Sequence, residues 1–429
     1  MNDARAWLES TKTRGMALGL QHTKAVLDRL NLAHTPEHIL HVAGSNGKGT
    51  VCALMAGALT LAGTPNILFS SPHLIRVEER IRFNGSPIDQ ATFDAALDKI
   101  ARASHQKPQI QLTFFEITYL AAMQCASDTG VEVLILETGL GGRKDATRAG
   151  PASASLVTSI STEHRDILGN SLAQIAKEKA AIARPGAPIL IRRPPEQAVE
   201  KAMLEEVGQA GQVILQEQQV PAHPEFISIP TDVSVRNEAL ILGQALFQKV
   251  GLPGDRLTDA YEQVQWPARM QHVQSNHMPS HRFLLDAAHN PSGLKRVLPE
   301  LERQIRAAVE RNGDGWCLVF GTSPQFDLEA FCQPLISLCK RIPPACIVLT
   351  EPQGGRYPAV ACTELAALQW PCNQLQVEPL PSIALDHLKS IDPSRNGFVV
   401  SLGSLYLQGN ILEALGLSSN EDLSLLAKQ

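Results

Sequence analysis

The feature that most constrains the fold is the ten-residue run HVAGSNGKGT, from His41 to Thr50. An apolar run beginning at Ile39 leads into it and predicts a buried strand. An apolar segment from Val51 to Ala62 follows and predicts a helix that ends before Gly63. A strand, a glycine-rich loop and a helix in this order bind polyphosphate, because backbone N–H groups at the positive end of the helix dipole face the anion. A simple turn with a surface lysine is the alternative, but the flanking strand and helix are the context that a phosphate loop requires.

The loop supplies the residues that we expect to contact a nucleotide. It is two residues shorter than the usual G-x-x-x-x-G-K-[ST] pattern, and a glycine separates its lysine from its hydroxyl residue. The lysine is expected to reach the terminal phosphates, and the hydroxyl is expected to bind Mg²⁺. The predicted nucleotide-binding residues of the loop are Gly44, Ser45, Asn46, Gly47, Lys48, Gly49 and Thr50.

Length and composition limit the class of protein. A chain of 429 residues is too long for one core and predicts two or three domains. The net charge of -5 argues against binding to nucleic acid, which needs a basic surface. We find no apolar stretch long enough for a bilayer and no apolar signal core, so we expect a cytoplasmic protein with no membrane partner. The eight cysteines form no C-x-x-C pair and are expected to be reduced, buried thiols.

Short apolar runs alternate with helical segments, which predicts an α/β fold with a mostly parallel sheet. The residues that follow such strands are polar or glycine-rich, and ligands collect beyond the carboxyl ends of parallel strands. A second α/β series begins after Trp266-Pro267, where the proline is a natural break. We therefore predict domains at residues 1–265 and 266–429. The expected strands are 67–69, 131–136, 156–160 and 188–191 in the first domain, and 283–287, 316–320, 347–350 and 398–402 in the second.

Motifs in family order carry a resemblance to a known group of enzymes. The short loop GxxGKG[ST] resembles the nucleotide loop of folylpolyglutamate synthase and dihydrofolate synthase, which belong to the Mur-type ATP-dependent amide ligases. The later segments that are similar to motifs of this family are Ser70 to Leu74 with Glu79 to Ile81, Thr113 to Glu116, Glu137 to Arg143 with Asp145 to Thr147, Glu178 to Ala180, Trp266 to Arg269, Asp286 to Pro291 and Gly403 to Leu407.

The resemblance implies a fold and a reaction. It implies a larger N-terminal P-loop ATPase domain of Mur-ligase type and a smaller, Rossmann-like C-terminal domain. It also implies a monomer that uses ATP and Mg²⁺ to add L-glutamate to a folate through an acyl phosphate. Because a carboxylate does not condense with an amine in water, activation by ATP supplies the leaving group. Some relatives also join dihydropteroate to the first glutamate, and the shared motifs do not separate the two cases.

Two other functions stay open. The chain could be a Mur-type ligase for another carboxylic acid, although the S-P-H-L and T-F-F-E segments favour the folate branch. It could also be a catalytically impaired nucleotide-binding regulator. Six positions depart from the family pattern: Glu163 replaces Asp, Lys144 replaces an apolar residue, Arg148 replaces Asn, and Ala181, Ala268 and Ala287 each replace Gly.

The resemblance implies catalytic roles for Lys48, Glu116, His164 and Lys179. Thr50, Glu116 and His164 are the implied metal ligands, and Lys179 is implied to carry a carbamate. Read without the family, Glu116 is a carboxylate at a helix N-terminus, His164 is a loop residue and Lys179 is a solvated surface charge.

Further residues are implied to contact the substrates and the nucleotide. Arg143 is a candidate bidentate clamp for a carboxylate or phosphate, with a tight turn and a surface arginine as the alternative. The implied substrate-binding residues are Ser71, His73, Arg80, Arg143 and Asp145. The remaining implied nucleotide contacts are Asn237, Arg269, Asp286 and His289.

Overall fold

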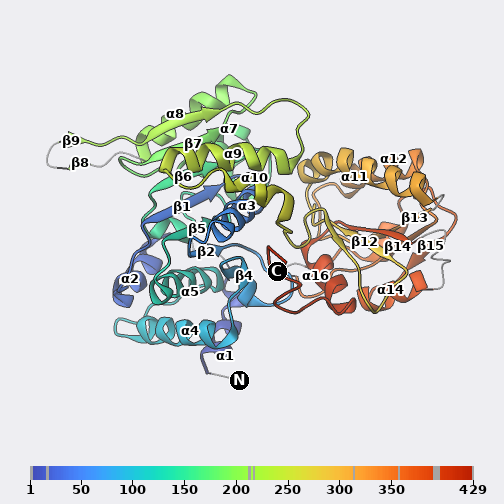
Figure 1. Ribbon diagram of the computed structural model, residues 1–429, viewed down its shortest axis with the longest axis horizontal. Coiled ribbons are helices and arrows are strands. Elements are labelled where there is room, and N and C mark those ends of the chain that lie inside the picture. Colours follow the sequence, from blue (N-terminus) through green and yellow to red (C-terminus); the bar gives the residue numbers. More distant parts are fainter. Residues whose placement is uncertain are drawn as a thin grey trace. The chain divides into compact units, whose positions relative to one another are not determined.

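The chain forms two compact α/β units. The computed structural model describes residues 3–15, 19–210, 214–215, 218–312, 315–355, 358–389 and 397–427. The N-terminal unit comprises residues 1–73, 77–264 and 425–429, and the C-terminal unit comprises residues 74–76 and 265–424. Each unit has its own sheet, as Figure 1 shows. No helix within the described ranges is long and apolar enough to cross a membrane.

The N-terminal unit is built on an eight-stranded sheet in the order β10-β7-β6-β1-β5-β2-β3-β4. The first six of these strands pair in parallel, whereas β3 is antiparallel to both β2 and β4. A separate two-stranded sheet joins β8 to β9. The strands of the unit are β1 (His38–Ala43), β2 (Asn66–Phe69), β3 (Ile81–Phe83), β4 (Ser86–Pro87), β5 (Val133–Glu137), β6 (Ala154–Val157), β7 (Pro188–Arg192), β8 (Ile214–Leu215), β9 (Gln218–Gln219) and β10 (His223–Ile227).

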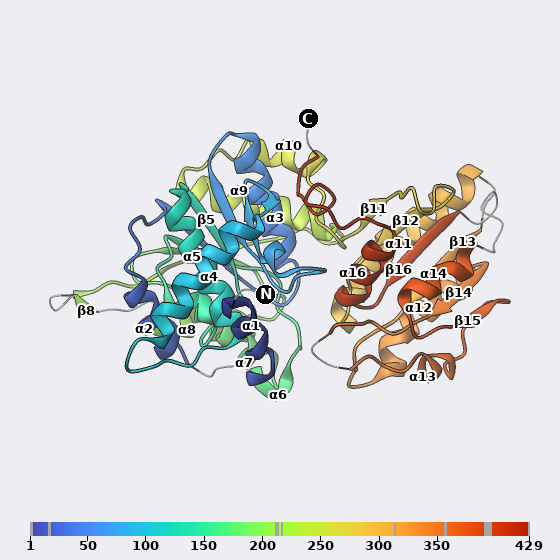
Figure 2. The same ribbon diagram turned by 90° about the horizontal axis from the view of Figure 1, so that it is seen from below.

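Helices cover both faces of this sheet. Helix α3 and its neighbours α9 and α10 pack together, while α4 and α5 lie side by side in both views (Figure 1 and Figure 2). The helices are α1 (Asp3–Ser10), η1 (Lys12–Arg14), α2 (Gln21–Leu30), α3 (Lys48–Leu61), η2 (Val77–Arg80), α4 (Gln90–His105), α5 (Phe114–Thr129), η3 (Ala146–Ala149), α6 (Arg165–Leu168), α7 (Leu172–Ala180), α8 (Gln197–Ala210), α9 (Val235–Val250) and α10 (Arg256–Gln263).

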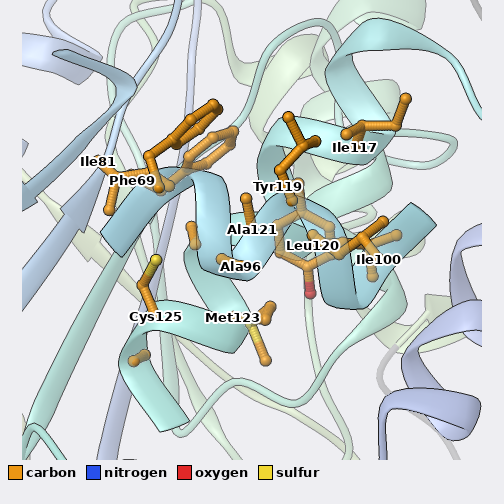
Figure 3. Close-up of a cluster of buried hydrophobic side chains, with 14 of the residues drawn as sticks. Phe69, Ile81, Ala96, Ile100, Ile117, Tyr119, Leu120, Ala121, Met123 and Cys125 are labelled. Atoms are coloured by element: carbon orange, nitrogen blue, oxygen red, sulfur yellow. The ribbon is translucent and has the colours of Figure 1, made fainter. Parts of the chain in front are cut away.

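One core of the N-terminal unit lies between α4, α5 and the sheet. Helix α5 is apolar nearly all round its surface, which is typical of a helix buried on several sides. Its residues Ile117, Tyr119 and Leu120 meet Ile100 of α4 and Phe69 of β2, as Figure 3 shows. Because these side chains are fully buried, the core fixes the start of α5 against the ends of the neighbouring strands.

The C-terminal unit has a six-stranded sheet in the order β11-β12-β16-β13-β14-β15. Strand β11 is antiparallel to β12, and the other strand pairs of this sheet in the described ranges are parallel. Helices α11 and α12 lie on one face and α14 and α16 on the other (Figure 1), and α13 packs into the same core as α11 and α12. Its elements are β11 (Gln271–Val273), β12 (Arg282–Leu285), α11 (Pro291–Asn312), β13 (Trp316–Phe320), α12 (Leu328–Arg341), β14 (Cys346–Leu349), α13 (Cys362–Ala366), β15 (Leu375–Val377), α14 (Pro381–Lys389), β16 (Phe398–Leu402) and α16 (Leu405–Ala414).

The strand order brings four loops to one edge of the larger sheet. Strand β1 lies between β5 and β6, and β5 also pairs with β2. All four strands are parallel, so the residues that follow them emerge at the same edge. The loops at this edge begin at Gly44 after β1, Ser70 after β2, Thr138 after β5 and Thr158 after β6. The predicted α/β class and mostly parallel sheet are confirmed.

Candidate active site

The loop from Gly44 to Gly47 connects β1 to α3 and leaves no room for larger residues at its start. Gly44 has φ +144°, and a Cβ atom there would lie 1.9 Å from Oγ1 of Thr158. The loop is held to the residues after β6, since the backbone N–H of Ser45 donates to the carbonyl of Ser159 at 2.8 Å. Helix α3 then begins at Lys48, so the loop stands at the positive end of a 14-residue helix. This backbone suits an anion.

Two lysines meet at the first carbonyl of this loop. The Nζ atom of Lys48 donates to the carbonyl of Gly44 at 2.8 Å, and the Nζ atom of Lys179 donates to the same oxygen at 3.0 Å. Lys179 comes from α7 and is 1% exposed. It also forms an ion pair with Glu163 at 2.7 Å. The fold therefore concentrates two cations beside the phosphate loop, although they lie far apart in the sequence.

The surroundings set the protonation of this buried pair. Burial lowers the pKa of Lys179 to about 8, although the charge of Glu163 acts in the opposite direction. Burial also pushes the pKa of Glu163 upward, but the charges of Lys179 and Lys48 hold it below its ordinary value. His164 follows directly, with φ +44°, and is the N-cap residue of the short helix α6. The predicted residues Lys48, Lys179 and His164 are thus near the same carboxylate.

Glu116 is engaged in the N-terminal cap of α5. Its Oε2 atom accepts from the backbone N–H and the hydroxyl of Thr113, both at 2.8 Å, and its Oε1 atom accepts from Thr23 at 2.7 Å. The Thr113 hydroxyl in turn accepts from the Glu116 backbone N–H, which completes a capping box. These contacts agree with the alternative role of Glu116, that of a carboxylate at a helix N-terminus. The metal role that the resemblance implies for Glu116 stays a prediction.

Sequence reasoning missed a second carboxylate, that of Glu137. It is the last residue of β5, lies opposite Val42 of β1, and is 6% exposed. Its Oε2 atom accepts from the backbone N–H of Ser71 at 3.2 Å. Its charge and that of Lys48 both act on the pKa of the Cys52 thiol, which burial raises, so both groups lie near the start of α3. The sequence did carry one signal for this residue: Glu137 is a charged residue at the end of the apolar run VLILE.

Asp145 organises the glycine-rich loop after β5. Its Oδ2 atom accepts from the backbone N–H groups of Gly139 and Leu140, both at 2.8 Å. Its Oδ1 atom accepts from the backbone and hydroxyl of Thr147, and that hydroxyl contacts the buried His41 at 2.7 Å. Burial raises the pKa of Asp145. The carboxylate thus joins this loop to β1, and its predicted contact with substrate stays a prediction.

Arg143 lies between two carboxylates of the chain. Its Nε atom is 2.7 Å from Oε1 of Glu178 on α7, and its NH2 atom is 2.7 Å from Oε2 of Glu206 on α8. Bonding to Glu206 and Glu178 raises the pKa of this arginine. The guanidinium edge that would clamp a substrate carboxylate therefore already holds internal partners. Nothing in these contacts supports the predicted substrate clamp.

A basic and aromatic cluster surrounds His73, one of the predicted substrate residues. Nε of Arg80 donates to Nδ1 of His73 at 2.9 Å, and the guanidinium lies 5.0 Å from the ring centre of Phe114. The ammonium of Lys12 lies 5.5 Å from the same ring. Burial and the two nearby cations lower the pKa of His73 to about 3, so the imidazole is neutral. Ser71, near Glu137, leads directly into this cluster.

The C-terminal unit contains three of the predicted nucleotide-binding residues, Arg269, Asp286 and His289. The carboxylate of Asp286 accepts from the backbone N–H groups of Met270 and Ala288, at 2.9 and 2.8 Å. Burial raises its pKa, and the charge of Arg269 opposes that shift. Nδ1 of His289 is 2.9 Å from the carbonyl of Ala287, a geometry that places the proton on Nδ1.

Asn237 lies in the N-terminal unit, in the first turn of α9, where its backbone N–H donates to Ser234 at 3.1 Å. Within the described ranges, no group of three or more His, Cys, Asp or Glu side chains is gathered so that it could hold a metal ion.

The fold and the phosphate loop define a two-unit α/β protein with a nucleotide-type anion site. Comparison with known proteins then gives the family. The chain is 30% identical over 321 residues to a dihydrofolate synthase/folylpolyglutamate synthase of Escherichia coli, an alignment that covers 70% of this chain and 74% of that protein. It is 31% identical over 333 residues to the protein of the same name from Bacillus subtilis, covering 71% and 76%. No family model matches the chain.

Solved structures agree on the fold. The structure of E. coli FolC in complex with DHPP and ADP matches with a TM-score of 0.78 at 24% identity, over 96% of this chain and 97% of that chain. A folylpolyglutamate synthase from Thermotoga maritima matches with a TM-score of 0.76 at 20% identity, over 98% and 99%. The chain belongs to the dihydrofolate synthase/folylpolyglutamate synthase family. It is an enzyme of the ATP-dependent ligase class.

Proposed function

We propose that this enzyme joins L-glutamate to a folate with the consumption of ATP, and that the acceptor carboxylate is activated as an acyl phosphate. The observation that carries the proposal is the Lys48 ammonium, which donates to the carbonyl of Gly44 in the glycine-rich loop at the N-terminus of α3. A cation and backbone N–H groups fixed in this way stabilise the charge that develops on a transferred phosphoryl group. Residues 1–265 would provide the ATP-binding domain, and residues 266–429 would provide the ligase domain with Arg269, Asp286 and His289.

The chain's donor set fits Mg²⁺ held together with nucleotide phosphates. Mg²⁺ keeps several waters and commonly takes only one or two protein carboxylates, so a cage of three acidic side chains is not required. Thr50 lies in the first turn of α3, and Glu137 lies near that helix start. We propose Thr50, Glu137 and His164 as the protein ligands, since both carboxylate oxygens of Glu116 serve its capping interactions. When bound, the metal would neutralise phosphate charge.

We also propose that Lys179 carries a carbamate in the active enzyme. Only the neutral amine reacts with CO₂, and a pKa near 8 leaves more of this amine neutral at physiological pH than the ordinary value of 10.5 does. The carbamate would turn the cation into an anion, so its contact with Glu163 would have to change or be bridged by a cation. Mass spectrometry of the native protein in bicarbonate buffer, with Lys179→Ala as control, tests the modification: a mass 44 Da heavier is expected only with Lys179 present, by the composition of CO₂.

The reaction is tested by incubating purified protein with ATP, Mg²⁺ and L-glutamate. One sample receives dihydropteroate and another tetrahydrofolate, and mass spectrometry identifies the products. A folate extended by glutamate supports folylpolyglutamate synthase activity, and dihydrofolate formed from dihydropteroate supports the second reaction. Nucleotide binding without amide formation from either acceptor would contradict the proposed reaction. Lys48→Ala serves as the folded, inactive control.

A further inference from the structure

The loop after β5 and helix α7 are joined by close backbone contact. The backbone N–H of Arg143 donates to the carbonyl of Glu178 at 3.0 Å. At Gly142, an added Cβ would lie 2.6 Å from the carbonyl oxygen of Glu178 and 3.0 Å from that of Lys179. Only glycine allows this approach without movement of the helix. The loop therefore touches α7 at the turn that carries Lys179.

The side chain of Arg143 extends this contact to a second helix. Its guanidinium pairs with Glu178 of α7 and with Glu206 of α8, both at 2.7 Å. The side chain of Glu206 is 4% exposed, so this carboxylate is almost entirely removed from water. A buried carboxylate that lost its cation would be strongly unfavourable. The pairing with Glu206 thus holds the guanidinium in the position where it also binds Glu178.

The far end of α7 has a second set of arginine contacts. Nε of Arg148 donates to the carbonyl of Ala181 at 2.6 Å, and the guanidinium of Arg184 donates to the carbonyls of Ile182, Arg148 and Gly150. Positive groups at the C-terminus of a helix are favourable because they offset its dipole. These contacts fix the end of α7 near Ala181, whereas Arg143 acts on the turn before it.

We infer that Arg143 is a positioning residue for Lys179 and does not bind the substrate. Glu178 is next to Lys179, so the Arg143–Glu178 pair sets the rotation of α7 that places the Nζ atom of Lys179 3.0 Å from the carbonyl oxygen of Gly44. The inference rests on the proposed function for its kinetic consequence, but the placement of Lys179 does not depend on which acid is ligated. Loss of the clamp would let α7 shift and would slow the chemical step, while acceptor and glutamate affinity would be retained.

The kinetic test compares Arg143→Ala and Arg143→Lys in the full-length protein. Arg143→Ala is expected to lower kcat about 10- to 100-fold and to leave both KM values within about twofold. Arg143→Lys is expected to recover part of kcat, because one ammonium can pair with one carboxylate but cannot reproduce both. Arg193→Ala is the matched control, since it removes a 2.8 Å pair between Arg193 and Glu200 of the same unit. It should leave kcat unchanged.

A second readout does not require ligase activity. An amine-reactive reagent is applied in CO₂-free buffer, and peptide mass spectrometry compares labelling of Lys179 with that of Lys177. The side chains of these lysines are 1% and 39% exposed on the same helix, so Lys177 is an internal reference. Arg143→Ala is expected to raise the Lys179-to-Lys177 labelling ratio at least about fivefold, because a displaced helix exposes the buried amine.

Two results would overturn the inference: an unchanged labelling ratio, or a tenfold rise in the acceptor KM with kcat unchanged, which would make Arg143 a substrate clamp. If the wild-type protein forms no amide product, the proposed reaction fails, while the labelling ratio still decides the role of Arg143.

Discussion

Replacing Glu163 by Gln is expected to destabilise the fold by an amount that depends steeply on pH. The Glu163 and Lys179 side chains are 11% and 1% exposed, and the charged atoms are 2.7 Å apart. Gln keeps nearly the same shape and a hydrogen-bond acceptor but removes the negative charge. Breaking a buried ion pair from one side commonly costs about 3–5 kcal/mol, because the remaining charge is left unpaired. Lys179 can avoid most of this penalty by releasing its proton.

The pKa of Lys179 sets the upper limit of the stability that Glu163→Gln can remove. With that pKa lowered to about 8 by burial, the protonated lysine is favoured over the neutral one by only about 1 kcal/mol at pH 7. The free energy of unfolding should therefore fall by about 1 kcal/mol at pH 7 and by about 3 kcal/mol at pH 6, and it should not change at pH 9.

The titrations of Lys179 and Glu163 both agree with this dependence on pH. The folded pKa of Lys179 lies below its ordinary value of 10.5, so wild-type stability rises between about pH 8 and 10.5, where only the unfolded chain keeps the proton. The pKa of Glu163 is also held low, and its contribution is lost only as the pH falls through that lowered pKa. Protonation of Glu163 therefore does not change the free energy of unfolding between pH 6 and pH 9.

The assay is urea unfolding of the wild type and Glu163→Gln at pH 6, 7 and 9. Glu205→Gln is the control, since it removes an exposed pair with Lys177 on the same helix and should change stability little at any pH. An equal loss of stability at pH 6 and pH 9 would refute the reasoning, as would an unchanged stability at pH 6. Either result would mean that the proton on Lys179 does not determine the cost of losing Glu163.

Three further predictions, each based on one or two substitutions, test the phosphate loop and the metal assignment. Lys48→Ala should lower the rate of amide formation at least about 100-fold with stability kept within about 0.5 kcal/mol, measured by steady-state kinetics and urea unfolding; full activity would exclude the phosphate role. Glu137→Gln should raise the Mg²⁺ concentration for half-maximal rate about tenfold. Glu116→Gln should instead cost about 1 kcal/mol of stability through loss of its helix cap. Equal effects of the two substitutions on the Mg²⁺ dependence would count against Glu137 as the metal ligand. Gly44→Ala should destabilise by more than about 3 kcal/mol, because its Cβ would meet Thr158, while Gly208→Ala, with open space around it in α8, should be neutral or stabilising.

The apolar patterns predicted the strands well because these strands are buried on both faces. The expected strands 316–320 and 398–402 coincide with β13 and β16. The strand expected at 156–160 instead ends at Val157, since Thr158 and Ser159 bond to the phosphate-loop segment. Residues 74–76 belong to the C-terminal unit, and no feature of the sequence predicted this assignment. A segment of three residues is too short to show a hydrophobic periodicity.

The charged partners could not be read from spacing. Arg143 was expected to bind substrate, but its two partners lie 35 and 63 positions further along the chain, at Glu178 and Glu206. The sequence shows which side chains carry charge, whereas the packing of α7 against α8 determines which of them meet. The same limit applies to the contact between Lys179 and Gly44, which nothing in the sequence predicted.

Glu116 and Glu137 are two glutamates that could bind Mg²⁺, and their positions in a helix and in a strand distinguish them. Glu116 is at the start of a helix, where a carboxylate accepts from backbone N–H groups of its own first turn. Glu137 ends a parallel strand beside β1, so it emerges at the edge where the phosphate loop also emerges. A helix start satisfies the carboxylate locally, and a strand end directs it toward a ligand. The end of β5 is therefore the better place to seek the Mg²⁺ ligand, even though the T-F-F-E motif first drew attention to α5.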